Sequence, residues 1–456
     1  MTEQTFTPPV LIIGGGLAGC EAAWQLASRG CAIQLYEMKP EKYSPAHQSQ
    51  DLAELVCSNS FRSDDSFSAV GLLKDEMRQL NSLIINSADT CAVPAGKALA
   101  VDRDLFASHI SSRVTNHPLI TVVRQEITVL PEPSRNLTIV ATGPLSSEAL
   151  AESLAELTGK KRLYFYDAIA PIVYRESLDM SIIYQKSRYD DGPGDYLNCP
   201  LDRNQYKHFI SELATADCTP LHDFEDSKYF EGCLPIEVMQ SRGDNTLRYG
   251  PMKPVGLKNP RTNEIPHAVV QLRKENKRET LYNLVGFQTK LTYKEQKRIF
   301  RLIPGLEQVE FARLGSIHRN TFINAPELLH PSLQVRLRPD LLIAGQLSGV
   351  EGYVESAAMG LLAGLNASLL LHERIPPAPP PATAFGALIN HLTTSDAKHF
   401  QPSNINFGLF PPWEKKVPKR LRGQIRAERS KIAMKAWSQS IRQKMHLAEK
   451  DSSDQK

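Results

Sequence analysis

Short apolar runs that lead into a glycine-containing turn occur at three distant places along the chain. Near the start, the apolar run 10–13 precedes a glycine-rich turn, a helical pattern over 21–27 and an apolar segment at 31–37. A strand, a helix and a second strand in this order predict a βαβ unit with parallel strands. Residues 137–143 and 340–346 repeat the pattern of a strand ending in a tight turn, which predicts further strands of the same fold.

The glycines of the first turn carry a dinucleotide-binding motif. Gly14, Gly16 and Gly19 follow a strand and open a helix, where the first glycine makes the turn, the second admits a pyrophosphate and the third lets helix and strand pack. Glu37 ends the second strand, where a carboxylate accepts hydrogen bonds from a ribose. FAD is favoured over NAD because the turns at 141–143 and 344–346 resemble those that complete an FAD site. The predicted cofactor-binding residues are Gly14, Gly15, Gly16, Leu17, Ala18, Gly19, Glu37, Thr142, Gly143, Gly345, Gln346, Glu351, Gly352 and Tyr353.

The middle of the chain has a different sequence pattern. Residues 58–65 are expected to form polar turns and 72–83 a helix, whereas 190–305 consists of short segments broken by Gly, Pro, Asn and Asp. The predicted fold class is α/β, with a Rossmann-like FAD-binding domain of the glutathione-reductase type and an inserted α+β domain. The expected division is 1–190 for the first part of the FAD-binding domain, 191–309 for the inserted domain, 310–375 for the second part, 376–383 for a Pro-rich linker and 384–456 for a C-terminal segment whose basic tail packs on the FAD-binding domain.

Length and composition restrict the kinds of protein that this chain can be. With 456 residues, 41% of them hydrophobic, the chain can bury the cores of two or three domains. No secretion signal and no apolar stretch of about 20 residues is visible, so we expect a cytoplasmic protein without a membrane span. The seven cysteines are scattered and odd in number, which argues for reduced thiols rather than disulfides or a metal site. Residues 415–450 hold about a dozen Lys and Arg, an excess that attracts phosphate backbones.

Five segments in order along the chain carry a further pattern: 14–24, 53–60, 230–239, 318–324 and 349–358. Together they closely resemble the folate- and FAD-dependent methylenetetrahydrofolate-tRNA-(uracil-5-)-methyltransferase family of bacteria. This resemblance implies methylation of C5 of the T-loop uridine at position 54 of tRNA. It implies methylenetetrahydrofolate as the one-carbon donor, FAD as the reductant and NADPH or NADH to regenerate it, with tRNA as partner and no protein partner.

Two cysteines in these segments fit the implied chemistry. Carbon 5 of uracil becomes nucleophilic only after a group such as a thiolate has added to carbon 6. Cys233, in a turn flanked by Gly232 and Pro235, is the candidate nucleophile, and Cys57, between apolar and polar residues, is a candidate for proton transfer. The resemblance implies catalytic roles for both, but the sequence leaves open which cysteine has which role. Burial as structural thiols is the alternative for each.

Other functions remain open at this stage. The same chemistry on ribosomal RNA, a wobble-uridine-modifying flavoprotein, a small-molecule FAD-dependent oxidoreductase and a non-catalytic RNA-binding module all share parts of the pattern. RNA contact is expected only from the basic segments 415–435 and 294–298, because no RRM, KH or OB signature is present. His318 and Arg319 are candidates for contact with folate glutamate or RNA phosphate, or are a solvated pair. The oligomeric state and the choice between NADPH and NADH are not determined.

Overall fold

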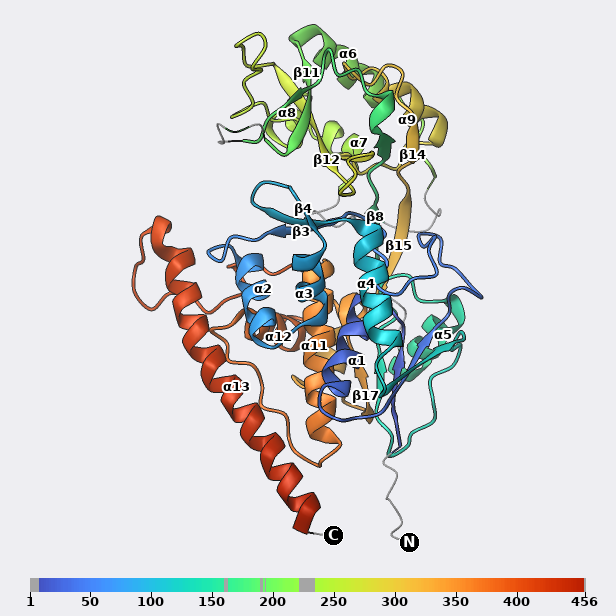
Figure 1. Ribbon diagram of the computed structural model, residues 1–456, viewed down its shortest axis with the longest axis vertical. Coiled ribbons are helices and arrows are strands. Elements are labelled where there is room, and N and C mark those ends of the chain that lie inside the picture. The colour runs from blue at the N-terminus through green and yellow to red at the C-terminus, as the bar shows by residue number, and fades with distance from the viewer. Residues whose placement is uncertain (1–7, 160–162, 189–191, 193, 221–233, 455–456) are drawn as a thin grey trace.

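A six-stranded sheet built from both ends of the chain organises the larger domain (Figure 1). The computed structural model describes residues 8–159, 163–188, 192, 194–220 and 234–454. Neighbouring strands are parallel except for the first pair, which confirms the predicted βαβ unit and its two later strands. The strand order is β16 (Gln334–Val335), β17 (Arg338–Ile343), β7 (Thr138–Val140), β1 (Val10–Ile13), β2 (Ile33–Glu37) and β6 (Ile120–Arg124).

Two helices with small residues at their contact lie against this sheet. The helix α1 (Leu17–Ala27) packs on α11 (Tyr353–Leu370) so closely that a Cβ atom on Gly360 would lie 2.2 Å from the Ala18 carbonyl oxygen. Gly364 is equally restricted, because its Cβ atom would lie 2.7 Å from the Ala22 oxygen. By length and composition α11 could cross a membrane, but 89% of that window is buried inside the structure. Its apolar side chains therefore form part of the core.

A small three-stranded sheet and several helices cover one side of the larger domain. Residues expected to form polar turns contain a strand instead, because β3 (Ser60–Ser63) pairs with a segment more than thirty residues later in the sequence, β5 (Ala98–Val101). The helix expected at 72–83 is two helices, interrupted at Asn81, whose φ of 55° is left-handed. The other elements here are β4 (Ala92–Val93), α2 (Ala69–Gln79), α3 (Leu83–Thr90), α4 (Arg103–Thr115) and α5 (Glu148–Thr158).

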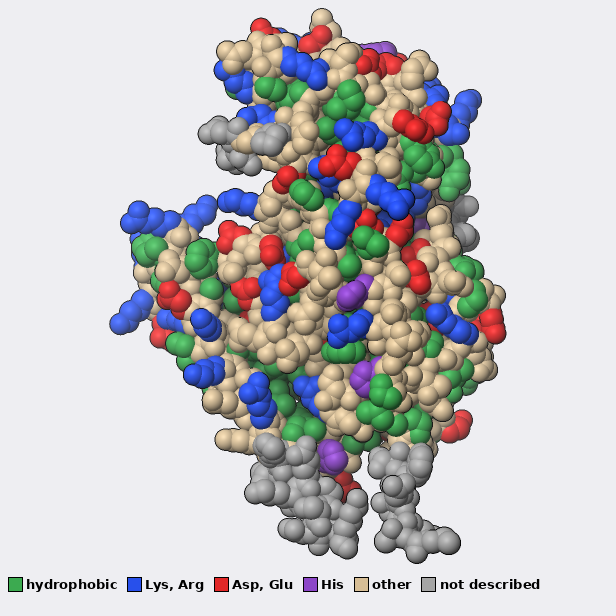
Figure 2. Space-filling model, in the orientation of Figure 1, with side chains coloured by type: hydrophobic (Ala, Val, Ile, Leu, Met, Phe, Trp, Pro, Cys, Tyr) green, Lys and Arg blue, Asp and Glu red, His purple; other side chains and the backbone are tan. Residues whose placement is uncertain are grey.

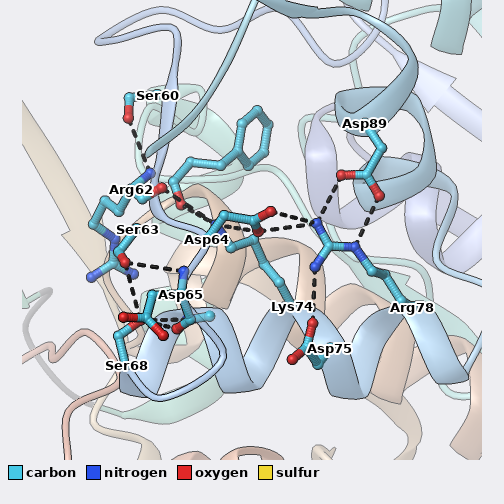
Figure 3. Close-up of polar contacts among 12 residues, drawn as sticks. Ser60, Arg62, Ser63, Asp64, Asp65, Ser68, Lys74, Asp75, Arg78 and Asp89 are labelled. Atoms are coloured by element: carbon cyan, nitrogen blue, oxygen red, sulfur yellow. Dashed lines mark hydrogen bonds and ion pairs between the residues drawn. The ribbon is translucent and has the colours of Figure 1, made fainter. Parts of the chain in front are cut away.

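A buried lysine fixes the turn between β3 and α2 (Figure 3). The Lys74 side chain is fully buried, and its Nζ donates hydrogen bonds to the carbonyl oxygens of Phe61 and Arg62, at 3.2 and 3.3 Å. These bonds hold Arg62 in a left-handed conformation with φ of 61°. Arg78 joins the same network through Asp64, Asp75 and Asp89.

The smaller domain is an antiparallel sheet flanked by helices. Its strands lie in the order β10 (Tyr184–Gln185), β11 (Tyr196–Leu201), β12 (Ala268–Lys274), β13 (Leu281–Leu284), β9 (Ile172–Tyr174) and β14 (Phe311–Arg313). This sheet extends beyond the expected boundaries of 191 and 309, because β9 and β10 precede the first and β14 follows the second. The helices are α6 (Arg203–Ala214), α7 (Ile236–Ser241), α8 (Thr246–Tyr249) and α9 (Tyr293–Phe300).

Two antiparallel strands connect the domains. The strands β8 (Leu163–Ala168) and β15 (Ile317–Phe322) pair over their whole length, from Leu163 opposite Phe322 to Ala168 opposite Ile317. The chain therefore enters and leaves the smaller domain at neighbouring positions (Figure 1).

The C-terminal segment packs on the larger domain through two helices. The buried Glu76 carboxylate accepts hydrogen bonds from the amides of Ala384 and Phe385, at 2.7 and 3.0 Å, in the first turn of α12 (Ala384–Thr394). It also accepts one from the Ser430 hydroxyl of α13 (Arg422–Asp454), at 2.5 Å. Burial raises the pKa of Glu76 to about 7. The basic tail is thus a helix anchored along one face, where Met434, Trp437 and Ile441 are buried, while Lys and Arg side chains lie on its exposed face (Figure 2).

Candidate active site

The glycine loop leaves an open space at the N-terminal end of α1. A Cβ atom on Gly14, whose φ is 106°, would lie 2.6 Å from the Ala141 oxygen, and one on Gly19 would lie 1.8 Å from the Gly14 oxygen. By contrast, a Cβ atom on Gly16 would have no neighbour within 4 Å. The helix amides that follow Gly16 have no side-chain cap. This arrangement of close packing on one side and open space on the other suits a pyrophosphate at a helix N-terminus.

A cleft runs from the glycine loop along the end of β2. Both carboxylate oxygens of Glu37 are held by backbone amides, Oε2 by Gly15 at 2.9 Å and Oε1 by Lys39 at 3.0 Å. Each oxygen has a second lone pair that can accept a ribose hydroxyl. Thr142 lines the opposite wall, and its hydroxyl lies 2.6 Å from that of Ser146. The site thus brings the predicted residues of β1, β2 and β7 together.

Cys57 lies in a second cleft, of about 280 Å³, between the two domains. The half-buried Cys57 sulfur is 4.0 Å from the carbonyl oxygen of Ala168, at the end of β8. The Tyr353 hydroxyl accepts hydrogen bonds from the amides of Cys57 and Ser58, at 2.7 and 3.1 Å. Burial raises the pKa of Tyr353, so its hydroxyl keeps its proton. Tyr353 therefore connects the start of α11 to the loop that carries the thiol.

Residues of the smaller domain also hold the Cys57 loop. The Arg273 guanidinium of β12 donates to the Asn59 side-chain oxygen at 2.9 Å and to the Ser58 hydroxyl at 2.8 Å. The Asn59 amide group in turn donates to the Lys274 carbonyl oxygen at 2.8 Å. Arg313 of β14 donates to the Cys57 carbonyl oxygen at 3.3 Å. Because these contacts cross from one domain to the other, the position of the thiol depends on both.

A buried ion pair completes this connection. Arg103 donates to the Leu55 carbonyl oxygen and forms an ion pair with Glu275, 2.9 Å away. The sequence gives no signal for Arg103, Arg273 or Arg313, since each acts on a residue far away in the chain. Each of them donates a hydrogen bond to a residue of the loop 55–59.

The turn after β17 contributes carboxyl and amide groups to the same cleft. The Gln346 side chain donates to Glu351 Oε2 at 2.6 Å, and both residues line the cleft. Burial, with the neighbouring charge of Asp167, raises the pKa of Glu351. Glu351 can therefore hold a proton near a ligand in the cleft. Gly345 has a φ of 72°, and a Cβ atom there would lie 2.8 Å from the Ala18 side chain.

Arg62 enters the cleft from β3, held by the Lys74 network described above. Its guanidinium forms an ion pair with Glu355 in the first turn of α11, and the same carboxylate oxygen accepts the Ile405 amide at 2.8 Å. Arg62 lines the cleft, so it brings a positive charge to a wall that also contains Glu351. The sequence gives no local signal for this position.

The remaining predicted residues have different outcomes. His318 lines the cleft, where burial and the nearby Arg313 lower its pKa, so the imidazole is neutral. Arg319 belongs to β15, but its side chain is not described. Cys233 lies outside the described residues. The cleft lining that sequence analysis did not identify includes Ser60, Asn283, Gln288, Asn320 and Asn404.

Comparisons with known proteins show to which family the chain belongs. The family profile of glucose inhibited division protein A matches residues 9–374. A methylenetetrahydrofolate–tRNA-(uracil-5-)-methyltransferase TrmFO of Desulfotalea psychrophila is 67% identical over 94% of this chain and 97% of its own. The chain belongs to the TrmFO family. A second TrmFO protein, of Geobacter sulfurreducens, is 56% identical over 95% of this chain and 100% of its own.

A solved structure supports the architecture of this TrmFO family member. Aquifex aeolicus GidA superposes with a TM-score of 0.70, covering 97% of this chain and 78% of its own. The two sequences are only 16% identical, so the likeness confirms the predicted fold alone. The membership in the TrmFO family rests instead on the 67% and 56% identity to the two TrmFO proteins.

Proposed function

We propose that this protein methylates C5 of the T-loop uridine of tRNA, with methylenetetrahydrofolate as the one-carbon donor. The observation that carries the proposal is the 67% identity to a TrmFO protein over nearly the full length of both chains. The geometry agrees with this chemistry, because a half-buried thiol and a proton-holding carboxyl group line one interdomain cleft.

FAD is the cofactor that the larger domain fits best. Gly14, Gly15, Gly16, Leu17, Ala18, Gly19, Glu37, Thr142 and Gly143 would hold its adenosine diphosphate part. Gly345, Gln346, Glu351, Gly352 and Tyr353 would hold the flavin part. Bound FAD, once reduced, would supply the two electrons that convert a methylene group into a methyl group. NADPH or NADH would regenerate it, and the cytoplasm, where tRNA is modified, is the proposed location.

The two cysteines divide the covalent and proton-transfer work. Cys233 adds as a thiolate to carbon 6 of the uracil, which moves electron density to carbon 5 for attack on the methylene carbon. Cys57 removes the proton from carbon 5 as the bond between the methylene carbon and the folate nitrogen breaks. The hydride equivalent that completes the methyl group would come from reduced FAD, and the Cys233 sulfur leaves carbon 6 last. Two observations support a two-thiol mechanism in this cleft, whichever cysteine has which role: Cys57 lines it, and the amide of Ile236, three positions after Cys233 in the sequence, donates to the carbonyl oxygen of Gln288, another lining residue, at 2.7 Å.

Methyl transfer is tested with labelled methylenetetrahydrofolate, a reductant and unmodified transcripts. We expect label in 5-methyluridine of tRNA, none in a transcript whose T-loop uridine is replaced by cytidine, and none in ribosomal RNA. If only ribosomal RNA became labelled, ribosomal RNA would be the substrate in place of tRNA. If no nucleoside became labelled, the proposed function would be rejected. Gly16→Val should lose flavin absorbance, because its side chain would occupy the open space of the glycine loop.

The cysteine roles are tested with RNA that contains 5-fluorouridine. Fluorine cannot leave carbon 5 as a cation, so the covalent adduct should persist in the wild type and in Cys57→Ala but be absent in Cys233→Ala. Both variants should retain FAD. Adduct loss only in Cys57→Ala would exchange the roles, and trapping with turnover in both variants would remove the thiol mechanism.

A further inference from the structure

An unassigned groove of about 680 Å³ lies on the smaller domain, between α6 and the α8 region. Arg203 and Lys207 line it from α6, one helical turn apart, and Arg248 lines it from α8. Asp244 is an acidic residue of the same lining, so the three cations leave a net positive charge. The groove is separate from both clefts of the candidate active site. The helix α6 lies at the end of the smaller domain that is remote from the larger one (Figure 1).

The groove is held open by hydrogen bonds rather than by loose side chains. The Tyr206 hydroxyl donates to the Asp244 carbonyl oxygen at 2.7 Å and accepts the Arg248 amide at 3.2 Å. The Arg248 guanidinium donates to the His267 carbonyl oxygen at 2.9 Å. This positive charge is therefore fixed in place before any ligand binds.

An aromatic ring stands beside these charges. Tyr249 is 73% exposed, and the Arg248 guanidinium lies 5.8 Å from the centre of its ring. An exposed ring next to several cations is the combination with which proteins bind single-stranded nucleic acid, since bases stack on the ring and cations contact the phosphates.

The helix α7 links this groove to the candidate active site. At its start, Ile236 is bonded to Gln288 of the cleft, and Gln240 near its end lines the groove. Four residues of α-helix span about 6 Å. Glu237 attaches the helix to the segment between β13 and α9 by accepting the Lys290 amide at 2.5 Å and the Thr289 hydroxyl at 3.0 Å. The residues through which this helix meets the two sites are therefore about one helical turn apart.

We propose that this groove binds the ribose-phosphate chain of the RNA next to the target uridine, with one unstacked base on Tyr249. The inference rests on the proposed RNA substrate. Arg203 and Lys207 contact phosphates, while the groove takes no part in the chemistry. It thus sets affinity and the orientation of the RNA, not the rate of the bound complex.

The test measures binding of an unmodified tRNA transcript over a salt series, without folate or reductant. Neutralising Arg203 and Lys207 to Ala should reduce the slope of log affinity against log salt by about 1.4 to 1.8, or 0.7 to 0.9 for each lost phosphate contact. Tyr249→Ala should weaken binding by about 5- to 150-fold, whereas Tyr249→Phe keeps the ring and stays within about twofold. Folding is not at risk, because Ala favours a helix and these side chains are exposed.

Lys398→Ala, an exposed residue on the larger domain, is the control for net charge. Turnover at saturating tRNA should stay at the wild-type value in the groove variants while KM rises. Unchanged affinity and salt slope, or an equal effect of Lys398→Ala, would overturn the proposal. Because binding is measured without methyl transfer, a wild type that binds through the groove but transfers no methyl group would reject only the proposed function.

Discussion

Replacing Tyr353 by Phe removes one hydroxyl that holds the loop of the candidate catalytic thiol. That oxygen accepts the amides of Cys57 and Ser58, at 2.7 and 3.1 Å. Both amides border the cleft, so water can solvate them after the change, and each lost bond costs about 0.5–1.5 kcal/mol rather than the larger value for an orphaned group. The loop should therefore be destabilised by about 1–3 kcal/mol, which lowers the equilibrium constant for its native conformation by about 5- to 150-fold. Turnover falls by up to this factor if only the native loop is active.

The assay compares turnover at equal flavin content with the amount of adduct formed on 5-fluorouridine RNA. Tyr353→Phe should retain FAD, because its ring remains. Tyr184→Phe is the matched control: it removes one buried hydrogen bond, to the Leu257 oxygen at 2.7 Å, in the smaller domain away from the cleft. It should lower thermal stability but leave turnover of the folded enzyme unchanged. Turnover of Tyr353→Phe within about twofold of wild type would refute the role of this hydroxyl.

Three further predictions concern stability and RNA binding. The pKa of Glu76 is raised to about 7 in the folded state, so its protonated form stabilises the fold at low pH and this contribution is lost as pH rises from about 4.5 to 7. In urea unfolding between pH 4.5 and 7, the free energy of unfolding of the wild type should fall by about 3 kcal/mol relative to that of Glu76→Gln. Parallel plots of this free energy against pH for the two proteins would contradict the burial argument. Neutralising Lys419, Arg420 and Arg422 together should reduce the slope of log tRNA affinity against log salt by about 2, with flavin content unchanged. A slope identical to that of the wild type would show that this segment is a solvated surface. Lys74→Met should cost about 1–3 kcal/mol in urea unfolding, since it removes the donor to two carbonyl oxygens, and a loss below about 0.5 kcal/mol would show that the network is dispensable.

Features that depend on neighbouring residues could be predicted from the sequence. The strand Val10–Ile13, the glycines that follow it and Glu37 form a local pattern whose geometry is nearly fixed by backbone sterics. The Cys57 loop could be identified only through a family resemblance. Its position in a cleft depends on Tyr353, 296 positions later, and on Arg313, 256 positions later.

Features that depend on distant pairing could not be predicted. The strand Ile172–Tyr174 has three residues, and its partners are strands about one hundred or more positions later. No local pattern assigns so short a segment to one sheet rather than another, which explains why the smaller domain begins before the expected boundary. For the same reason the sequence did not indicate a role for Arg273, whose partner Asn59 is 214 positions away.

The paired strands β8 and β15 make the smaller domain, in topological terms, the loop of a very long hairpin. Ala168 lies opposite Ile317, so residues 169–316 begin and end at adjacent points on the larger domain. A segment inserted in this way can be lengthened, shortened or exchanged without rerouting any strand of the parent sheet, and chain closure depends only weakly on loop length. Evolution could therefore vary the smaller domain while it keeps the larger one, although each new domain would have to supply its own partners for the loop 55–59.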